Sequence, residues 1–139
     1  MKEIEIKGTI YKIKEVLTVK TRMEYLKVIG TLQTQISEIA KKNGYQPKDL
    51  PTIFEKVITQ DQAVIFELGI SLDVILGFEF SLFKVLYTGF VIEPKLSEAE
   101  MENLDNETYQ KIRDILNEMI QEYLSVESDF ELKKKHGNV

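Results

Sequence analysis

The stretch NETYQKIRDILNEMIQEYLSV, residues 106–126, decides the fold that we expect for this chain. Its apolar residues recur at alternating steps of three and four, which is the spacing of one face of an α-helix. This seam comprises Tyr109, Ile112, Leu116, Met119, Tyr123 and Val126. The pattern predicts a closing helix whose apolar face packs on the rest of the protein.

The stretch just before it, EPKLSEAEMENLDNE (residues 93–107), is crowded with carboxylates. Ser97 followed by Glu100 is the pattern of a capping box, in which each side chain bonds the backbone N–H of the other residue. Asp105 or Asn106 is then placed to cap the closing helix. A metal site or an acid–base pair is the alternative. We favour capping, because interactions at helix N-termini and exposure to solvent account for most of these carboxylates without a metal ion or a substrate.

The N-terminal residues indicate a β-hairpin over about residues 2–14, with a two-residue turn at Gly8-Thr9. Glycine at the first turn position supplies the positive φ that a type II′ turn needs. The expected cross-strand pairs are Ile4 with Ile13, Ile6 with Tyr11, Glu5 with Lys12 and Glu3 with Lys14. This register places apolar pairs on one face and opposite charges on the other, which favours strand pairing.

The central residues are expected to be helical. A helix from about Thr18 to Lys42, continuous or broken at Gly30, is indicated by a row of apolar residues at helical spacing. That row consists of Tyr25, Ile29, Leu32, Ile36 and Ile39. A second helix is predicted from Pro51 to about Gln60, since proline suits the first turn of a helix.

Residues 61–92 are predicted to form two or three buried helices, with breaks near Gly69 and Gly77. A strand is the alternative for residues 83–92, which are rich in aromatic and β-branched side chains. Pro94 ends this apolar region.

These elements predict a mainly α protein with a small N-terminal β-hairpin, an α+β fold arranged as a compact single-domain helical bundle. The domain is expected to span residues 1–130, because a chain of 139 residues with 43% apolar content suffices for one core. Residues 131–139 are expected to form a flexible C-terminal tail, since only Leu132 and Val139 offer apolar side chains there.

Composition narrows the functional classes. The net charge of −5 argues against a nucleic-acid partner, because proteins that bind a phosphate backbone usually carry a basic face. The absence of cysteine excludes disulfides, thiolate metal sites and cysteine nucleophiles. Charged residues interrupt every long apolar stretch and appear from the second residue on, so we expect neither a membrane span nor a signal peptide.

No residue is predicted to be catalytic, to bind a cofactor or to hold a metal, and an enzyme is the least favoured class. His136 is the only histidine, and no nucleophile lies near it in the sequence. Glu67, Asp73 and Glu79 are the best candidates for a Mg²⁺ site, but steps of six residues do not keep them on one helix face. Solvated positions at the edges of buried helices are therefore favoured for them.

Two further groups have a structural and a functional interpretation, and the structural one is favoured for both. The aromatic residues that fit either a ligand pocket or a core are Phe78, Phe80, Phe83, Tyr87 and Phe90. The basic residues that fit either a phosphate contact or a solvated tail are Lys133, Lys134 and Lys135.

Two segments together resemble a known family. MKEIEIKGTIYKIKEVLTVKT (residues 1–21), a hairpin that leads into a helix, is similar to the start of the small tail assembly chaperones of long-tailed, siphovirus-like bacteriophages. VIEPKLSEAEMENLDNETYQKIRDILNEMI (residues 91–120) is similar to their ending, where a Glu-Pro, a short capped acidic turn and a closing helix follow the apolar middle. The similarity covers about half of the chain.

The resemblance implies a non-enzymatic protein made in the cytoplasm of the host bacterium. The implied partners are the phage tape measure protein, which it holds soluble, and the tail tube protein, whose subunits it helps to recruit. Self-association is implied as well. The resemblance also implies that ribosomes slip frame near the end of the gene to make a longer form. An adenine run encoding Lys133 to Lys135 is a candidate position, and a solvated tail without special codons is the alternative.

Two other classes stay open at this point. A structural virion protein, such as a head–tail connector or neck protein, would also be small, acidic and helical, but it would persist in the purified particle. A small phage regulator would bind one host protein instead of the tail proteins. Amphipathic helices are compatible with the chaperone, because they offer apolar surface to the helices of a long partner.

Overall fold

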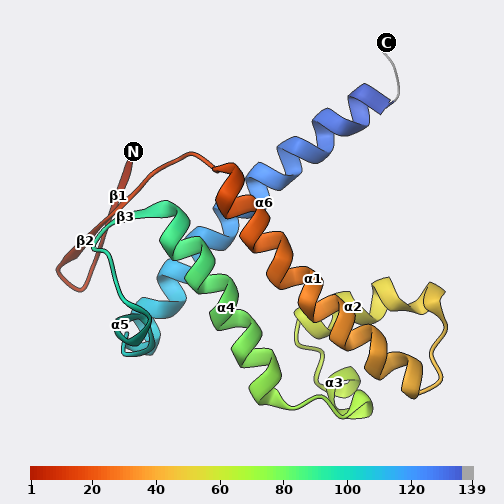
Figure 1. Cartoon of the computed structure of the whole chain (residues 1–139). Coiled ribbons are helices and arrows are strands. Elements are labelled where there is room, and N and C mark those ends of the chain that lie inside the picture. The colour runs from red at the N-terminus through yellow and green to blue at the C-terminus, as the bar shows by residue number, and fades with distance from the viewer. Residues whose placement is uncertain (136–139) are drawn as a thin grey trace. The chain divides into compact units, whose positions relative to one another are not determined.

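The computed structural model describes the backbone of residues 1–135 and the side chains of residues 1–125. Over these residues the fold is mainly α with a small antiparallel sheet, as predicted (Figure 1). The elements are β1 (Lys2–Ile6), β2 (Thr9–Ile13), α1 (Val19–Lys42), the 3-10 helix η1 (Pro47–Asp49), α2 (Leu50–Ile58), α3 (Gln62–Leu68), α4 (Leu72–Phe90), β3 (Val91–Glu93), α5 (Glu98–Glu102) and α6 (Asn106–Lys135).

The chain divides into two compact units, and each is described by itself below. Unit 1 contains residues 1–22 and the chain from residue 83 on, whereas unit 2 contains residues 23–82. The boundaries fall inside α1 and inside α4. The single domain over residues 1–130 and the flexible tail over 131–139 stay predictions. The backbone of α6 continues to Lys135, and residues 136–139 lie outside the described residues.

The hairpin turns at Lys7-Gly8 and not at the predicted Gly8-Thr9. Lys7 has a φ of 51° and Gly8 a φ of 84°. Positive φ at both central residues is the pattern of a type I′ turn, whose twist matches the twist of the flanking strands. The expectation of a type II′ turn was therefore wrong, because a lysine adopts the left-handed conformation here.

The register of the hairpin consequently differs from the predicted one by two residues. The observed pairs are Lys2 with Ile13, Glu3 with Lys12, Ile4 with Tyr11, Glu5 with Ile10 and Ile6 with Thr9. The predicted pairs Ile4–Ile13, Ile6–Tyr11, Glu5–Lys12 and Glu3–Lys14 were wrong. Side chains alternate with a period of two along a strand, so a shift of two keeps the same residues on the buried face. The alternation along the strands therefore does not distinguish the two registers, although the observed one places Lys2 opposite Ile13 and Thr9 opposite Ile6.

A third strand completes the sheet in the order β1-β2-β3. β3 pairs antiparallel with β2 and places Lys12 opposite Glu93, with 3.4 Å between Nζ and Oε2. For residues 83–92, the prediction of a helix is correct as far as Phe90, where α4 ends. The alternative prediction of a strand is correct from Val91 on.

The core of unit 1 forms between the end of α4 and the seam of α6. The ring of Phe83 meets Tyr109 edge to face at 4.7 Å between centroids, and Phe90 stacks on Tyr123 at 6.1 Å. The central seam residues Ile112 and Leu116 are fully buried. The predicted seam is thus confirmed as far as Tyr123, and the side chain of Val126 lies outside the described residues.

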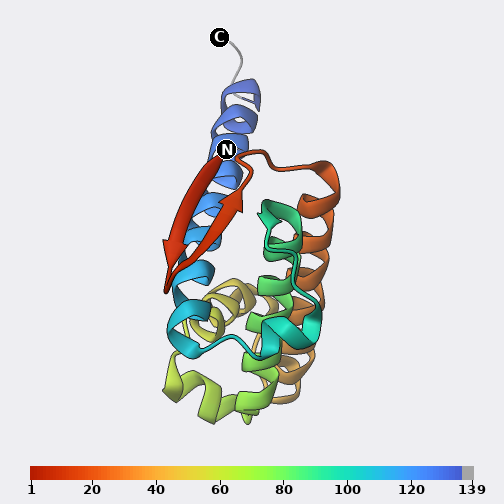
Figure 2. The same ribbon diagram turned by 90° about the vertical axis from the view of Figure 1, so that its left-hand side faces the viewer.

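Two polar contacts tie the N-terminal segment to α6. Lys7 in the turn pairs with Asp105 at 2.7 Å, just before α6 begins. Further along, the hydroxyl of Tyr123 donates a hydrogen bond to the carbonyl oxygen of Glu15. The hairpin therefore lies alongside α6 (Figure 2).

Unit 2 is built from most of α1, η1, α2, α3 and the first part of α4 around an apolar core. α1 runs without a break past Gly30, and Gly44, with a φ of 84°, follows its end. The buried core residues are Leu32, Ile36, Ala40, Ile53, Val57, Ile65, Leu68, Ile70 and Ile75. The predicted break at Gly69 is confirmed, because this residue ends α3 with a φ of 70°. The predicted break at Gly77 was wrong: glycine inside a helix costs only about 1 kcal/mol, which packing of neighbours such as Ile75 outweighs.

We expect Gly89→Ala to destabilise the protein by about 1–3 kcal/mol. An added Cβ at this position in α4 would lie 2.4 Å from Oγ1 and 2.5 Å from Cγ2 of the buried Thr21. The matched control is Gly77→Ala in the same helix, where an added Cβ meets nothing within 4 Å. That change should stabilise by about 0.5–1 kcal/mol, since alanine is the better helix former. Urea unfolding of both variants measures the shifts, and a Gly89→Ala protein as stable as the wild type would contradict the close approach.

Candidate binding surface

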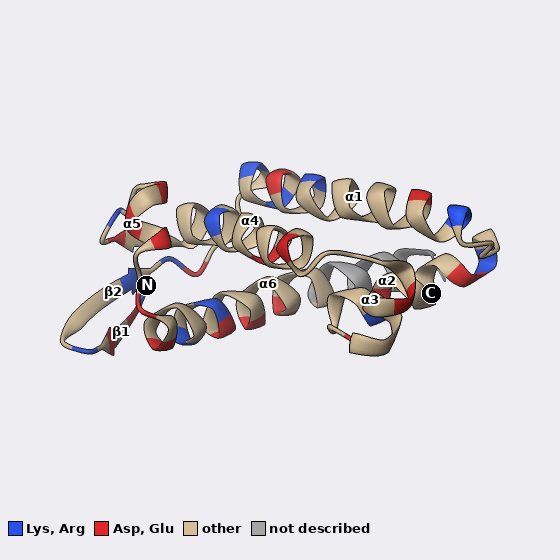
Figure 3. Ribbon diagram, turned by 90° about the horizontal axis from the view of Figure 1, so that it is seen from below, with Lys and Arg blue, Asp and Glu red and all other residues tan. Residues whose placement is uncertain are grey.

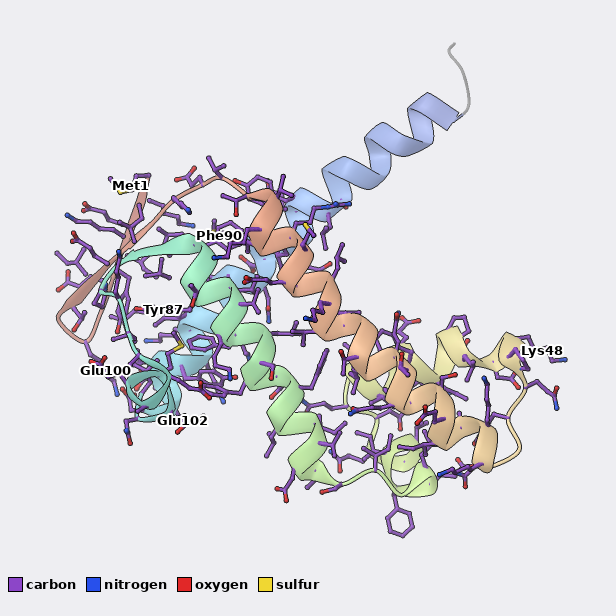
Figure 4. All side chains as sticks on the ribbon, in the orientation of Figure 1. Met1, Lys48, Tyr87, Phe90, Glu100 and Glu102 are labelled. Atoms are coloured by element: carbon purple, nitrogen blue, oxygen red, sulfur yellow. The ribbon has the colours of Figure 1, made fainter. Side chains whose placement is uncertain are left out.

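Two of the carboxylates before α6, those of Glu100 and Asp105, serve as helix caps. The hydroxyl oxygen of Ser97 accepts the backbone N–H of Glu100 at 3.1 Å, and Oε1 of Glu100 accepts the N–H of Ser97 at 3.0 Å. The backbone N–H of Ser97 first, and its hydroxyl next, hold the pKa of the Glu100 carboxyl below its usual value. Glu100 and Glu102 both lie on α5 (Figure 4). The predicted capping box is confirmed.

Asp105 caps α6. It is one of the two residues, Asp105 and Asn106, that were predicted for this role. Its Oδ2 accepts the backbone N–H of Thr108 at 3.2 Å, and its Oδ1 accepts the hydroxyl of Thr108 at 2.6 Å. The ammonium of Lys7 lies 2.7 Å from the same carboxylate. Lys7 first, and the two bonds from Thr108 next, hold the pKa of Asp105 well below its usual range. Asp105 thus serves the helix start and the hairpin turn together.

Glu67, Asp73 and Glu79 are not brought together into one cluster. Oε1 of Glu67 accepts the hydroxyl of Tyr45, and Oε1 of Glu79 accepts the amide of Gln60, each at 2.7 Å. Among residues whose side chains are described, no three or more His, Asp or Glu come together in a way that would hold a metal ion.

The aromatic residues of α4 are mainly core. Phe83, Tyr87 and Phe90 are buried, and the hydroxyl of Tyr87 donates to the carbonyl oxygen of Pro94 at 2.5 Å. Burial raises the pKa of the Tyr87 hydroxyl. Tyr87 and Phe90 are labelled in Figure 4. His136 and the side chains of residues 133–135 lie outside the described residues.

α1 has a second, exposed seam besides the buried one. Along unit 2 this α1 seam consists of Met23, Leu26, Gly30, Gln33 and Ser37. The steps between these residues alternate between three and four, so all five lie on one helix face. Met23 is 62% and Leu26 is 42% exposed. α1 therefore buries one uncharged face and leaves another open to a partner.

Charge is arranged around this seam and not within it. Helix α1 carries five basic and two acidic residues, although the whole chain has a net charge of −5. Residues 28–37 contain no charged side chain, and the charges gather towards the two ends of the helix (Figure 3). An uncharged seam between basic ends suits a partner helix that is apolar on one face and acidic beside it.

Two hollows flank the uncharged part of α1 inside unit 2. The larger, the α2 pocket, has a volume of about 430 Å³ and is lined by Gln33, Ile36, Ser37, Pro47, Leu50, Pro51 and Phe54. The smaller, of about 260 Å³, is lined by Val28, Thr31, Leu32 and Gln35 of α1 and by Val74, Gly77, Phe78 and Ser81 of α4. Gln33 and Ser37 belong both to the α1 seam and to the α2 pocket, so the two features form one continuous surface.

Sequence reasoning missed this surface. The signal was present, since Met23, Leu26 and Gln33 repeat the helical spacing already noted for the buried row. It was passed over because glycine, glutamine and serine do not count as apolar. The α2 pocket had no sequence signal, since its walls come from α1 and from a proline-bounded segment that only the fold brings together.

Comparison with protein-family models, with curated proteins and with solved structures finds no match to this chain. In the part of the chain that the structure describes, no helix combines the length and apolar character that a membrane span requires.

Exchanging Asp105 for Asn tests the tie between the cap and the hairpin turn. Asparagine still caps a helix but carries no charge. Because the pKa of Asp105 is lowered by folding, its contribution is complete above the unfolded value of about 4 and is lost as the pH falls. The melting temperature of the wild type should decline below about pH 5, and that of the variant should start lower at pH 7 and decline less. Identical pH profiles in circular dichroism melting would rule out the charged tie.

Exchanging Ser97 for Ala should lower the free energy of unfolding by roughly 1 kcal/mol, because the N–H of Glu100 loses its acceptor. Millimolar Mg²⁺ or Ca²⁺ should leave the melting temperature of the wild type unchanged. Stabilisation by either ion that disappears with Glu93→Gln would show that the acidic stretch binds metal after all.

Proposed function

We propose that this protein is a non-enzymatic tail assembly chaperone of a long-tailed bacteriophage. In this proposal it acts in the cytoplasm of the infected bacterium, binds the tape measure protein and helps to recruit tail tube subunits. The observation that carries the proposal is the α1 seam, whose Met23 and Leu26 are open to solvent and which reaches the α2 pocket at Gln33 and Ser37.

The α1 seam supports binding of a partner helix. Its residues follow the spacing with which two α-helices interdigitate, and the glycine and serine among them let a second backbone come close. Contacts of this kind are the helix-in-groove mode of peptide recognition. A chaperone for a long helical partner needs such a surface, whereas an enzyme needs convergent polar groups.

The two terminal segments support the proposal as well. The β1–β2 hairpin leads into α1, and the capped α5 precedes the closing helix α6. The resembled family has these elements in the same order. Self-association, also implied by the resemblance, would cover part of the apolar surface that is exposed in one copy.

The test is co-expression of the tagged protein with the tape measure and tail tube proteins encoded beside it, followed by affinity capture. The wild type should recover the tape measure protein. Met23→Glu combined with Leu26→Glu should reduce recovery at least tenfold, because each buried apolar side chain contributes about 1.5–3 kcal/mol. Ile10→Glu is the matched control, since Ile10 is an apolar residue of β2 that is 52% exposed and does not belong to the α1 seam.

Equal recovery by the wild type and the double variant would remove the α1 seam from the proposal. Failure to recover either tail protein would overturn the chaperone function itself. Presence of this chain in purified virions, detected by mass spectrometry, would favour a structural virion protein instead.

A further inference from the structure

Strand β1 has a neighbouring strand on one side only. The sheet order β1-β2-β3 places it at the border of the sheet, as the strand that begins at the marked N-terminus (Figure 2). The two-residue turn makes Ile6 and Thr9 a hydrogen-bonded pair, and such pairs alternate along an antiparallel ladder. The even-numbered residues of β1 therefore direct their backbone N–H and C=O groups to β2, whereas Glu3 and Glu5 direct theirs outward.

These outward groups, which we call the β1 edge, are open. Among the residues that the structure describes, no protein group forms a hydrogen bond with the backbone N–H or C=O of Glu3 or Glu5. Their side chains are exposed as well. Each of the two residues offers one backbone donor and one acceptor, so the edge is a template for a further strand.

The two faces of β1 differ, and an added strand would meet both. Ile4 and Ile6 lie on the face that packs on the protein, where Ile4 is half-buried and Ile6 is buried. Glu3 and Glu5 lie on the solvent face, because side chains alternate along a strand. An added strand runs about 4.8 Å from β1, so its side chains would alternate between apolar and carboxylate neighbours.

The carboxylates of the β1 edge have no cation of their own. Lys12 stands opposite Glu3, but its Nζ lies 3.4 Å from Oε2 of Glu93 on the other side of β2. Glu5 stands opposite Ile10. Within the described residues, neither Glu3 nor Glu5 forms an ion pair.

The other cations of the hairpin are directed elsewhere. Lys7 in the turn contacts Asp105 at 2.7 Å and Glu107 at 3.2 Å. Lys2 lies on the opposite face of β1 from the two glutamates. Lys14 follows the last residue of β2 and is one strand further from the edge. The solvent face of β1 itself therefore presents acidic charge only.

A second copy of the same edge is a poor partner. In an antiparallel pair, outward-directed residues of one strand stand opposite outward-directed residues of the other. Every two-fold alignment that uses both Glu3 and Glu5 would therefore place at least one glutamate directly opposite a glutamate. Like charges in that position are destabilising, so the edge disfavours its own copy and favours a basic strand.

We infer that the β1 edge binds an extended segment of a partner protein, antiparallel to β1, in which basic and apolar residues alternate. Lysines or arginines of the segment lie opposite Glu3 and Glu5, and its apolar side chains lie beside Ile4 and Ile6. Main-chain hydrogen bonds supply affinity, and the alternation supplies selectivity. The α1 seam takes no part in this contact, so the inference goes beyond the proposed function and does not rest on it.

A synthetic peptide tests the inference on the intact protein. The probe is about six residues long, alternates lysine and valine, carries a fluorophore and is blocked at both ends. Fluorescence anisotropy should show saturable binding that is at least tenfold tighter than binding of a peptide in which all lysines precede all valines. Equal binding of the two peptides would overturn the inference, because charge alone would then account for the contact.

Methylation of backbone nitrogens in the probe separates strand pairing from attraction between charges. In the antiparallel arrangement, the backbone N–H groups of the lysines donate to β1 and those of the valines point away. Methylating the lysine backbone nitrogens should weaken binding at least tenfold, and methylating the valine backbone nitrogens should not. Equal effects, or the reverse order, would contradict the antiparallel pairing.

Exchange of charge on the protein completes the test. Glu3→Lys combined with Glu5→Lys should weaken binding of the lysine–valine peptide at least tenfold and create binding of a peptide that alternates glutamate and valine. A gain of binding cannot arise from unfolding. Glu24→Lys combined with Glu38→Lys is the matched control, because both residues are exposed on α1 and the charge changes equally. A wild type that binds no lysine–valine peptide, or an edge variant that still prefers it, would overturn the inference.

Discussion

The close approach of Thr21 to Gly89 is the constraint on which unit 1 depends. Any side chain at position 89 would come within 3 Å of the threonine, so only glycine lets the first turn of α1 lie against the last turn of α4. Thr21 is in turn fixed by Thr18, which bonds both its N–H and its hydroxyl. Just beyond this contact, the N–H of Lys14 donates to the carbonyl oxygen of Phe90 at 2.8 Å. The end of α4, the start of β3 and the end of the hairpin are therefore positioned together.

Features set by neighbours along the chain could be predicted from the sequence. The capping box at Ser97, the cap at Asp105 and the seam through Leu116 each depend on residues within a few positions of one another. The hairpin register could not be predicted, because the period of two fits more than one alignment and a lysine at positive φ is rare. The continuity of α4 through Gly77 depends on burial of residues around it, which a local pattern does not reveal.

The candidate surface was hidden for a related reason. A sequence pattern separates apolar from polar residues, whereas a docking surface needs only the absence of charge and room for a second backbone. On α1 the seam passes from Met23 and Leu26 to Gly30, Gln33 and Ser37, so only two of its five positions are apolar. Residues 65–68 of α3 include three apolar residues, Ile65, Phe66 and Leu68, and a helix this short cannot bury all three. Which one stays outside, Phe66, is decided by the contacts of the other two.

The hydrogen bond from the hydroxyl of Tyr123 to the carbonyl oxygen of Glu15 joins residues that lie 108 positions apart in the sequence. Unit 2, in contrast, is one continuous stretch of 23–82. On the ribosome, the hairpin emerges before unit 2 but meets its partner helix only after unit 2 has been made, since α6 follows residues 23–82. Residues 23–82 can meanwhile collapse on contacts of short sequence separation, which form fast. Synthesis therefore favours an order in which the middle of the chain folds before its two ends meet.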